Sequence, residues 1–132
     1  MEVEVKSREE KYRGKQLAQL KEMDVREVAK YMPSRSRRTL LRHFDVVEKF
    51  VKRCEQNEAN KKRLRTHLRD IIIVPRLVGK TIEVHSGKVF QEVQITVDMI
   101  GHRLGEFALT RKKVSHSAAG IGATKGSKAL KK

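Results

Sequence analysis

A stripe of apolar residues between positions 36 and 55 constrains the fold of this sequence more than any other feature. Apolar side chains recur there at steps of three or four residues: Leu40, Phe44, Val47, Val51 and Cys54. This period is typical of a helix that buries one face. The sequence therefore predicts a helix over 36–55. Because Cys54 lies on the stripe, we interpret it as a core residue rather than a nucleophile.

Short β patterns follow the helix. Residues 71–74 form a β-branched run that stops at Pro75, which is typical of a buried strand. Residues 81–85 and 89–97 alternate between apolar and polar side chains, as two further strands do. Between these strands, Ser86-Gly87 stands where a tight hairpin turn requires a positive φ. A short helix is expected to open at Asp98.

The N-terminal part has weaker helical signals. Leu17 and Leu20 predict a short amphipathic helix over 11–21. The sequence Asp-Val-Arg-Glu at 24–27 is a candidate capping box for a second helix that ends at Pro33. The basic stretch 61–69 is expected to be extended or irregular.

Positive charge is concentrated in two segments of the chain. The formal net charge of the 132 residues is +15. Residues 33–69 carry twelve basic and four acidic side chains, and residues 111–132 carry seven basic side chains and no acidic one. The other two segments are nearly neutral. Such a distribution indicates a surface that binds phosphate. From Lys113 onward nothing is available for burial, which predicts a tail that is disordered when free.

Three arginines crowd the start of the predicted helix, where its dipole disfavours cations. Arg35, Arg37 and Arg38 occupy this first turn, and each is expected to cost a few tenths of a kcal/mol. An external anion such as phosphate, which also suits a helix N-terminus, is the simplest compensation.

Several kinds of chemistry are disfavoured. Gly79-Lys80-Thr81 lacks the earlier glycine of a phosphate-binding loop, since Val74 stands in its place. One cysteine and five scattered histidines give no metal spacing, and no cofactor is expected. His85 and His102 have no nucleophile or carboxylate pair spaced with them for catalysis. No secretory signal or membrane-spanning run is found, and with the single cysteine this indicates a cytoplasmic protein.

Aromatic residues are too few to suggest a stacking surface. Phe90 is the only aromatic residue in a predicted strand. Binding is therefore expected to rest on contacts of Arg and Lys with phosphate and sugar. The residues alone leave three alternatives open: a DNA-compacting protein, an RNA-modifying enzyme, and an interaction protein whose N-terminal helices bind partner helices.

One set of motifs carries a family resemblance. Ser86-Gly87-Lys88, Ile95 and the sequence Ile-Gly-His-Arg-Leu-Gly-Glu-Phe at 100–107 resemble the signature of the small-subunit ribosomal protein S-nineteen family. Arg-Thr-His at 65–67 and Val-Gly-Lys-Thr-Ile at 78–82 extend the match. Further matches to the archaeal and eukaryotic branch of this family lie at 12–14, 32–38 and 120–125.

The resemblance implies an α+β fold, with a small three-stranded sheet and packed helices. It implies a helical N-terminal extension (1–33), an RNA-binding core (34–112) and a basic flexible tail (113–132). The implied function is that of a structural, non-enzymatic constituent of the small ribosomal subunit in translation. The implied partners are head-domain ribosomal RNA, the neighbouring small-subunit ribosomal protein thirteen, and transfer RNA near the tail, with neither DNA nor a membrane expected.

Residues are assigned to RNA binding from the resemblance and, for the first three, from their charge at the helix start. The predicted RNA-binding residues are Arg35, Arg37, Arg38, Arg65, His67, Arg69, Lys80, His85, Lys88, His102, Arg103, Arg111, Lys112 and Lys113. In the tail, Lys125 and Lys128 are the residues expected nearest to transfer RNA. No catalytic or metal-binding residue is assigned.

Overall fold

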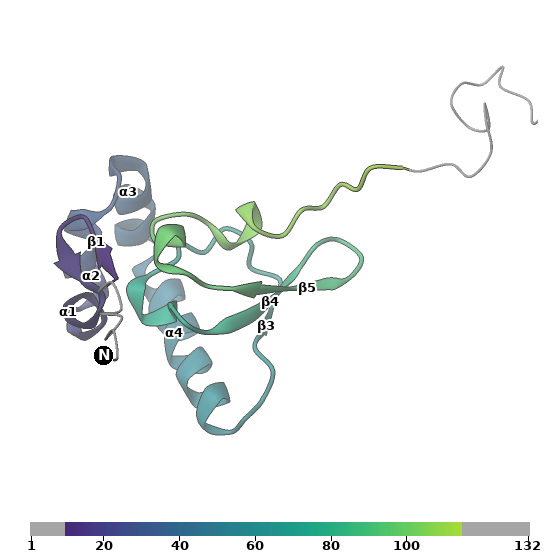
Figure 1. Ribbon diagram of the computed structural model, residues 1–132, viewed down its shortest axis with the longest axis horizontal. Coiled ribbons are helices and arrows are strands. Elements are labelled where there is room, and N and C mark those ends of the chain that lie inside the picture. The colour runs from purple at the N-terminus through teal and green to yellow at the C-terminus, as the bar shows by residue number, and fades with distance from the viewer. Residues whose placement is uncertain (1–9, 115–132) are drawn as a thin grey trace, which may run out of the picture.

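The computed structural model describes residues 10–114, which form an N-terminal group of short elements and an α+β core (Figure 1). The N-terminal group contains strands β1 (Lys11–Tyr12) and β2 (Lys15–Gln16), helices α1 (Leu17–Glu22) and α2 (Val25–Val28), and the 3-10 turn Ala29–Tyr31. The core contains helices α3 (Ser34–Arg42) and α4 (Phe44–Ala59), and strands β3 (Arg65–Thr66), β4 (Thr81–His85) and β5 (Phe90–Gln94). Further 3-10 turns lie at Pro75–Leu77, Val97–Met99 and Leu104–Glu106. The predicted α+β class is confirmed.

The helix predicted over 36–55 is two helices, so its continuity was predicted wrongly. α3 and α4 meet at His43, whose backbone leaves the helical region (φ −112°, ψ 30°). The backbone N–H of His43 still donates to Thr39 (3.0 Å), and its carbonyl accepts from Val47 (3.2 Å). The apolar period therefore continues across the break, and the predicted face is the buried one. Its buried side chains are Leu40, Val47, Phe50, Val51 and Cys54.

The sheet has the order β3–β4–β5, but its members differ from those predicted. β3 runs parallel to β4, and β4 runs antiparallel to β5. The strand predicted at 71–74 is not part of the sheet. This run is fully buried and has one bridge, between Ile72 and Arg103. Its backbone bonds instead with the turn-rich segment after β5: Ile73 donates to His102 (2.8 Å) and accepts from Gly101 (3.0 Å).

The third strand of the sheet, β3, lies in the basic stretch predicted to be irregular. Its two residues pair with Glu83 and Val84 of β4. β3 has only two residues, the exposed Arg65 and the buried Thr66, and two residues are too few to show a strand pattern in the sequence. Position beside β4, rather than an intrinsic preference, makes this segment a strand.

The predicted hairpin turn between β4 and β5 is confirmed. Gly87 has φ +94°, the left-handed region that favours glycine. The turn is closed by Ser86, whose backbone N–H and Oγ both donate to the carbonyl of Val89 at 2.8 Å. The short helix predicted at Asp98 is the 3-10 turn Val97–Met99.

Two N-terminal predictions were wrong in part. Residues 11–16 form a β hairpin rather than helix, because Arg13 and Gly14 both adopt positive φ (48° and 79°). Only the end of the predicted helix is helical, as α1. α2 does begin after Asp24, but the Asp24 side chain makes no capping hydrogen bond, and its backbone carbonyl accepts from Glu27 and Val28 instead.

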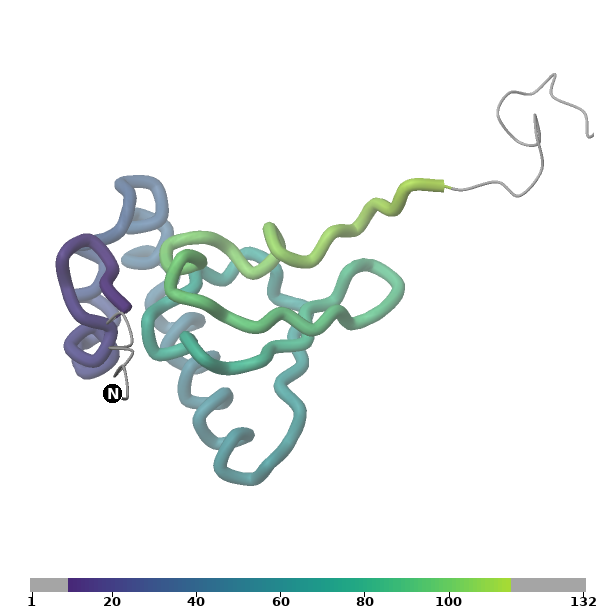
Figure 2. The backbone as a smooth tube through the Cα atoms, viewed as in Figure 1, coloured from purple at the N-terminus to yellow at the C-terminus, as the bar shows by residue number. Residues whose placement is uncertain are grey.

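One buried cluster joins the N-terminal group to the core. Val25, Val28 and Met32 pack in the same cluster as Leu40 and the buried run 71–74. The tube in Figure 2 shows the N-terminal group beside α3 and α4, and the last described residues (yellow-green) leading away from the sheet. None of the helices within 10–114 is long and apolar enough to cross a membrane. The tail prediction for 115–132 lies outside the described residues.

Cys54 lies in this core, as predicted. Its side chain is buried on α4, and burial raises the pKa of its thiol to about 11, above the ordinary value of 9.0. The thiol is therefore protonated at neutral pH, and thiolate is the nucleophilic form. This supports the interpretation of Cys54 as a packing residue.

Candidate nucleic-acid interface

The exposed side of α3 carries the first group of predicted RNA-binding residues. Arg35, Arg37 and Arg38 are exposed, and with Arg42 and the half-exposed Leu41 they line an open hollow of about 630 Å³. Consecutive helical turns present these side chains on one side of the helix. Four arginine residues thus line one hollow, which favours an anionic ligand.

Arg37 differs from its neighbours because it has an intramolecular role. Its Nε donates to the carbonyl of Ala29 (3.0 Å), and its Nη2 donates to those of Lys30 (3.0 Å) and Met32 (3.2 Å). These carbonyls end the preceding helical turn, where a cation is favoured. The position of Arg37 at a helix start thus needs no external anion. In the described part of the chain, the guanidinium groups of Arg35 and Arg38 form no hydrogen bond or ion pair.

Arg65 lies at an ion-pair cluster on β3 and β4. Glu83 is 7% exposed and bonds with Arg65 Nε at 2.5 Å, and Arg63 lies 3.7 Å from its other oxygen. A nearly buried carboxylate requires such partners, because desolvation penalises an unpaired charge. Sequence reasoning missed Arg63 and Glu83. The alternation over 81–85, which places Glu83 on the same sheet face as His85, was the available signal.

Three rings meet at the end of the sheet, and we call His67, His85 and Phe90 the ring cluster. The centroid of the His67 ring lies 4.5 Å from that of His85 and 5.1 Å from that of Phe90. His85 and Phe90 contact edge to face at 5.0 Å. The guanidinium of Arg65 lies 5.2 Å from the Phe90 centroid. The structure thus brings together three predicted residues with Phe90, which had not been assigned to binding.

Arg69 and Lys80 make intramolecular contacts instead of lying free on the surface. The Arg69 guanidinium donates to the carbonyls of His85 (2.6 Å), Gly105 (2.9 Å) and Ala108 (2.5 Å). It therefore ties β4 to the segment that leads into the tail. Lys80 is only 12% exposed, and its Nζ lies 2.5 Å from the carboxylate of Glu58 on α4. Both cations stabilise the fold.

The hairpin turn and the root of the tail bring further predicted cations together. Lys88 in the turn and Lys112 line an open hollow of about 420 Å³, with Ser86, Val89, Leu109 and Thr110. Arg111 and Lys113 are exposed on either side of Lys112. Two lysines distant in sequence thus lie at one hollow, as a phosphate contact would require. Lys125 and Lys128 lie outside the described residues.

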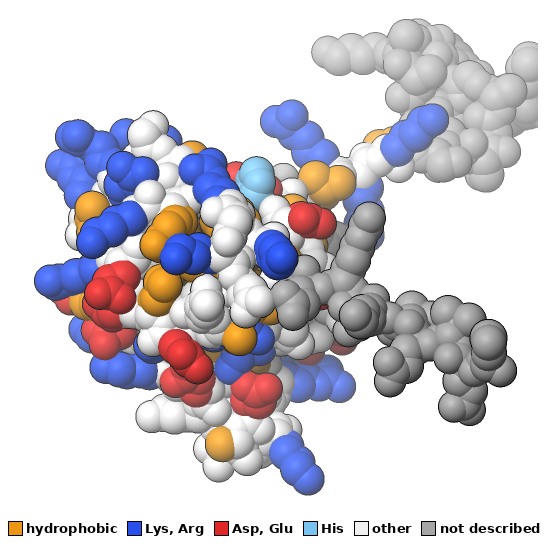
Figure 3. Space-filling model, turned by 60° about the vertical axis from the view of Figure 1, so that its left-hand side comes forward, with side chains coloured by type: hydrophobic (Ala, Val, Ile, Leu, Met, Phe, Trp, Pro, Cys, Tyr) orange, Lys and Arg blue, Asp and Glu red, His pale blue; other side chains and the backbone are white. Residues whose placement is uncertain are grey.

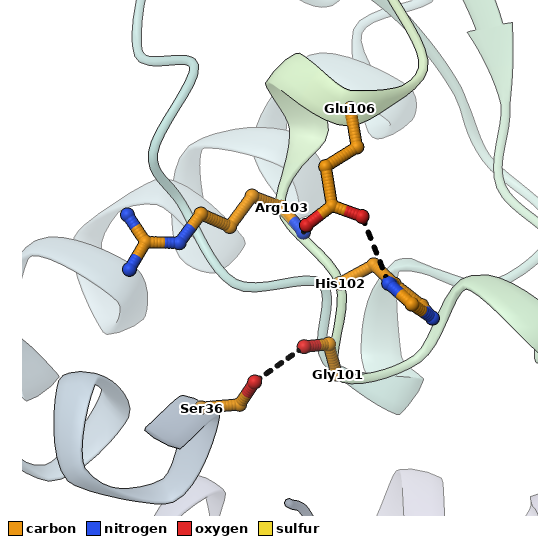
Figure 4. A network of polar contacts seen from close by, with 5 residues as sticks. All are labelled: Ser36, Gly101, His102, Arg103 and Glu106. Atoms are coloured by element: carbon orange, nitrogen blue, oxygen red, sulfur yellow. Dashed lines mark hydrogen bonds and ion pairs between the residues drawn. The ribbon is translucent and has the colours of Figure 1, made fainter.

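His102 and Arg103 lie in the glycine-rich turn that α3 supports (Figure 4). Ser36 Oγ donates to the carbonyl of Gly101 at 2.6 Å, which anchors the turn to α3. His102 Nδ1 lies 2.8 Å from Glu106, while the Arg103 side chain points away from this pair (Figure 4). Ser36 and Glu106 were missed as supporting residues.

The described residues present exposed cations at several places on the surface. Between residues 10 and 114, no group of three His, Cys, Asp or Glu side chains is placed to hold a metal ion. Figure 3 shows Lys and Arg side chains gathered over part of one face, with acidic side chains grouped beside them. Fold and surface together define a small, basic α+β protein with several groups of exposed cations, as a protein that binds a polyanion presents.

Comparison with known proteins identifies the family. The sequence profile of the family described as "Ribosomal protein S19" matches residues 34–116. Proteins named "Small ribosomal subunit protein uS19" are similar over most of the chain. That of Methanocella arvoryzae is 49% identical over 89% of this chain and 82% of its own length. That of Methanococcoides burtonii is 44% identical over 89% and 84%. That of Thermoplasma acidophilum is 44% identical over 93% and 80%.

The chain belongs to the ribosomal protein S19 family. The predicted family is confirmed, and so is its archaeal and eukaryotic branch, since these relatives are archaeal. Membership also confirms that the chain is a structural ribosomal protein and not an enzyme. The RNA-modifying enzyme is thereby excluded as an alternative.

Proposed function

We propose that this chain is a structural constituent of the small ribosomal subunit that binds ribosomal RNA of the head. The observation that carries the proposal is the family match over 34–116, together with relatives named as small-subunit proteins. The match begins at the first residue of α3, so it includes the hollow lined by Arg35 and Arg38.

Three groups of exposed or half-buried side chains are the proposed contacts with RNA. They are the partner-free arginines of α3, the ring cluster with Arg65, and the cations around the hairpin turn and tail root: Arg35, Arg38, Arg65, His67, His85, Lys88, Arg111, Lys112 and Lys113. His102 and Arg103 form a smaller fourth group. Arg37, Arg69 and Lys80 act indirectly, by fixing the backbone and the packing that position these groups.

The tail is proposed to extend toward transfer RNA at the decoding site, with Lys125 and Lys128 nearest to it. What supports this is charge: residues 111–132 carry seven basic side chains and no acidic one. A polycationic segment attached to an anchored core samples nearby RNA at high effective concentration.

Small-subunit ribosomal protein thirteen is the proposed neighbour of the chain, and the cytoplasm is its proposed compartment.

Sedimentation tests the proposal. Archaeal cells expressing the tagged full chain are lysed, and ribosomes are washed at high salt before a sucrose gradient. We expect the chain to migrate with the small subunit after the wash, because contacts of fixed shape survive salt that removes purely electrostatic binding. Migration at the top of the gradient, or loss at modest salt, would contradict the proposal and favour a general polyanion binder such as a DNA-compacting protein.

A further inference from the structure

The register of the sheet places the ring cluster on one face and at one end. β3 and β4 pair Thr66 with Val84, so the next residues along each chain, His67 and His85, lie side by side. β4 and β5 pair His85 with Phe90. Side chains two residues apart share a face of a strand. Each strand or its extension thus contributes one ring to the same row, across all three strands.

The rings are arranged so that one of them faces solvent. His67 and His85 are tilted by 34° to each other with ring centroids 4.5 Å apart, whereas Phe90 meets both imidazoles edge to face. His67 is exposed, while His85 and Phe90 are half-buried. Within residues 10–114, the ring nitrogens of His67 make no hydrogen bond. His67 is therefore the most exposed ring of the cluster, and the other two rings support it.

The cluster is fixed before any ligand arrives. His85 Nδ1 accepts the backbone N–H of Gly87 at 3.2 Å, and the His85 carbonyl is held by Arg69. Arg65 lies over Phe90 and is held in turn by Glu83. A surface that is already ordered loses little conformational entropy on binding.

Charge around the cluster suits a nucleotide. Arg63 is exposed beside β3, and Lys88 follows the cluster in the hairpin turn. The acidic pair of this face, Glu83 and Glu92, lies in the neighbouring row of the sheet. Carboxylates repel phosphate, so that row disfavours a phosphate. The end of the sheet that carries the rings is therefore the favourable place for it.

We propose that the ring cluster is a stacking platform for one unpaired RNA base, with His67 as the ring that the base contacts. This inference rests on the proposed RNA-binding function and specifies its ligand as a nucleobase rather than a phosphate. Planar side chains on an exposed sheet stack with bases of any sequence, because every base has a π face. Arg65 supplies a further plane and a positive charge beside it.

Fluorescence anisotropy with the full chain tests the platform. The two probes are a single-stranded oligoadenylate and an abasic ribose-phosphate oligomer of equal length and charge. We expect the wild-type chain to bind the oligoadenylate about tenfold more tightly than the abasic oligomer, which is the order of one stacked base. His67→Ala removes this preference, His67→Phe keeps it, and His67→Lys removes it while binding both probes through charge.

The three variants separate stacking from charge and from folding. Circular dichroism establishes that each is folded, and His67 is exposed, so no large loss of stability is expected. Equal affinity of the wild type for both probes would overturn the proposal, as would retention of the preference by His67→Lys. These results would leave the sedimentation of the chain with the small subunit unchanged, so a failure here is distinguishable from a failure of the proposed function.

Discussion

The arginines of this protein are of two kinds that their sequence context does not distinguish. Arg37, Arg69 and Arg76 each donate to backbone carbonyls of distant or preceding segments; Arg76, for example, reaches Lys21 at the end of α1. Arg38, by contrast, has no such partner within the described residues. A guanidinium has five donors in a rigid fork, which suits both carbonyls and phosphates. Only the fold decides which acceptor is within reach.

Arg69→Ala is expected to destabilise the protein by about 2–4 kcal/mol. The substitution removes three charge-assisted hydrogen bonds and leaves the half-buried carbonyls of His85, Gly105 and Ala108 without their donor. The loss of stability for Arg69→Lys should lie between zero and that of Arg69→Ala, because one ammonium cannot span three carbonyls. Urea unfolding followed by circular dichroism measures the free energy of unfolding.

Arg38→Ala is the matched control for this experiment. It removes an arginine that is exposed and forms no hydrogen bond in the described part of the chain, so a change within about 0.5 kcal/mol is expected. If Arg69→Ala were no more destabilising than Arg38→Ala, the three carbonyl contacts would contribute nothing to stability.

At the scale of elements, two glycines of the core are constrained for different physical reasons. Gly87 adopts φ +94°, and a Cβ added there meets no atom within 4 Å. Gly105 has an ordinary φ, but its added Cβ would lie 2.9 Å from the carbonyl oxygen of Arg69. The first position is limited by backbone conformation and the second by space.

Gly87→Ala is expected to lower the free energy of unfolding by about 1–2 kcal/mol, the penalty of an alanine in the left-handed region. Gly105→Ala is expected to lower it by more. Gly105 also donates its N–H to Arg69 at 2.8 Å, so a shift of the backbone there weakens a bond as well. Thermal unfolding measures both. Gly87→Asn should recover part of the loss, because asparagine tolerates the left-handed region, whereas Gly105→Asn should recover none. Recovery at both positions, or at neither, would contradict the distinction.

The elements show how far local sequence determines the fold. The hairpin turn at Gly87 and the buried face of α3 and α4 were predictable, because each depends on residues within a few positions of one another. The break at His43 was not, because the apolar period continues across it. Nor was β3, since its pairing with β4 depends on contacts eighteen residues away along the chain. The run 71–74 was rightly predicted to be buried, but its hydrogen-bond partners were beyond local reasoning.

For the whole molecule, the sequence predicted where the positive charge lies but not which of the cations are free to contact RNA. The basic segment 33–69 includes α3 and β3, where the candidate interface lies. Within it, however, Arg37 and Arg69 bind carbonyls, and Arg65 pairs with Glu83. The ring cluster was missed because Phe90 was taken as the only aromatic residue in a predicted strand, and the imidazole rings of His67 and His85 were not considered as stacking surfaces. Net charge therefore overstates the number of phosphates that this face can contact directly.

The salt dependence of RNA binding follows from this distinction. Replacing two arginines of α3 that form no hydrogen bond or ion pair within residues 10–114, as Arg35→Ala with Arg38→Ala, should lower affinity for small-subunit ribosomal RNA. It should also reduce the slope of log K against log salt concentration by about 1.5, the contribution of two phosphate contacts. Binding titrations over a range of salt concentrations measure the slope.

Arg37→Ala is the control that separates charge from phosphate contact. It removes the same unit of charge from the same helix turn, but its guanidinium is bound to the carbonyls of Ala29, Lys30 and Met32. We therefore expect lower stability by about 1–3 kcal/mol and a nearly unchanged slope. If Arg37→Ala reduced the slope as much per residue as the double variant, all three arginines would contact phosphate. The carbonyl contacts of Arg37 would then have to be exchanged for RNA contacts on binding.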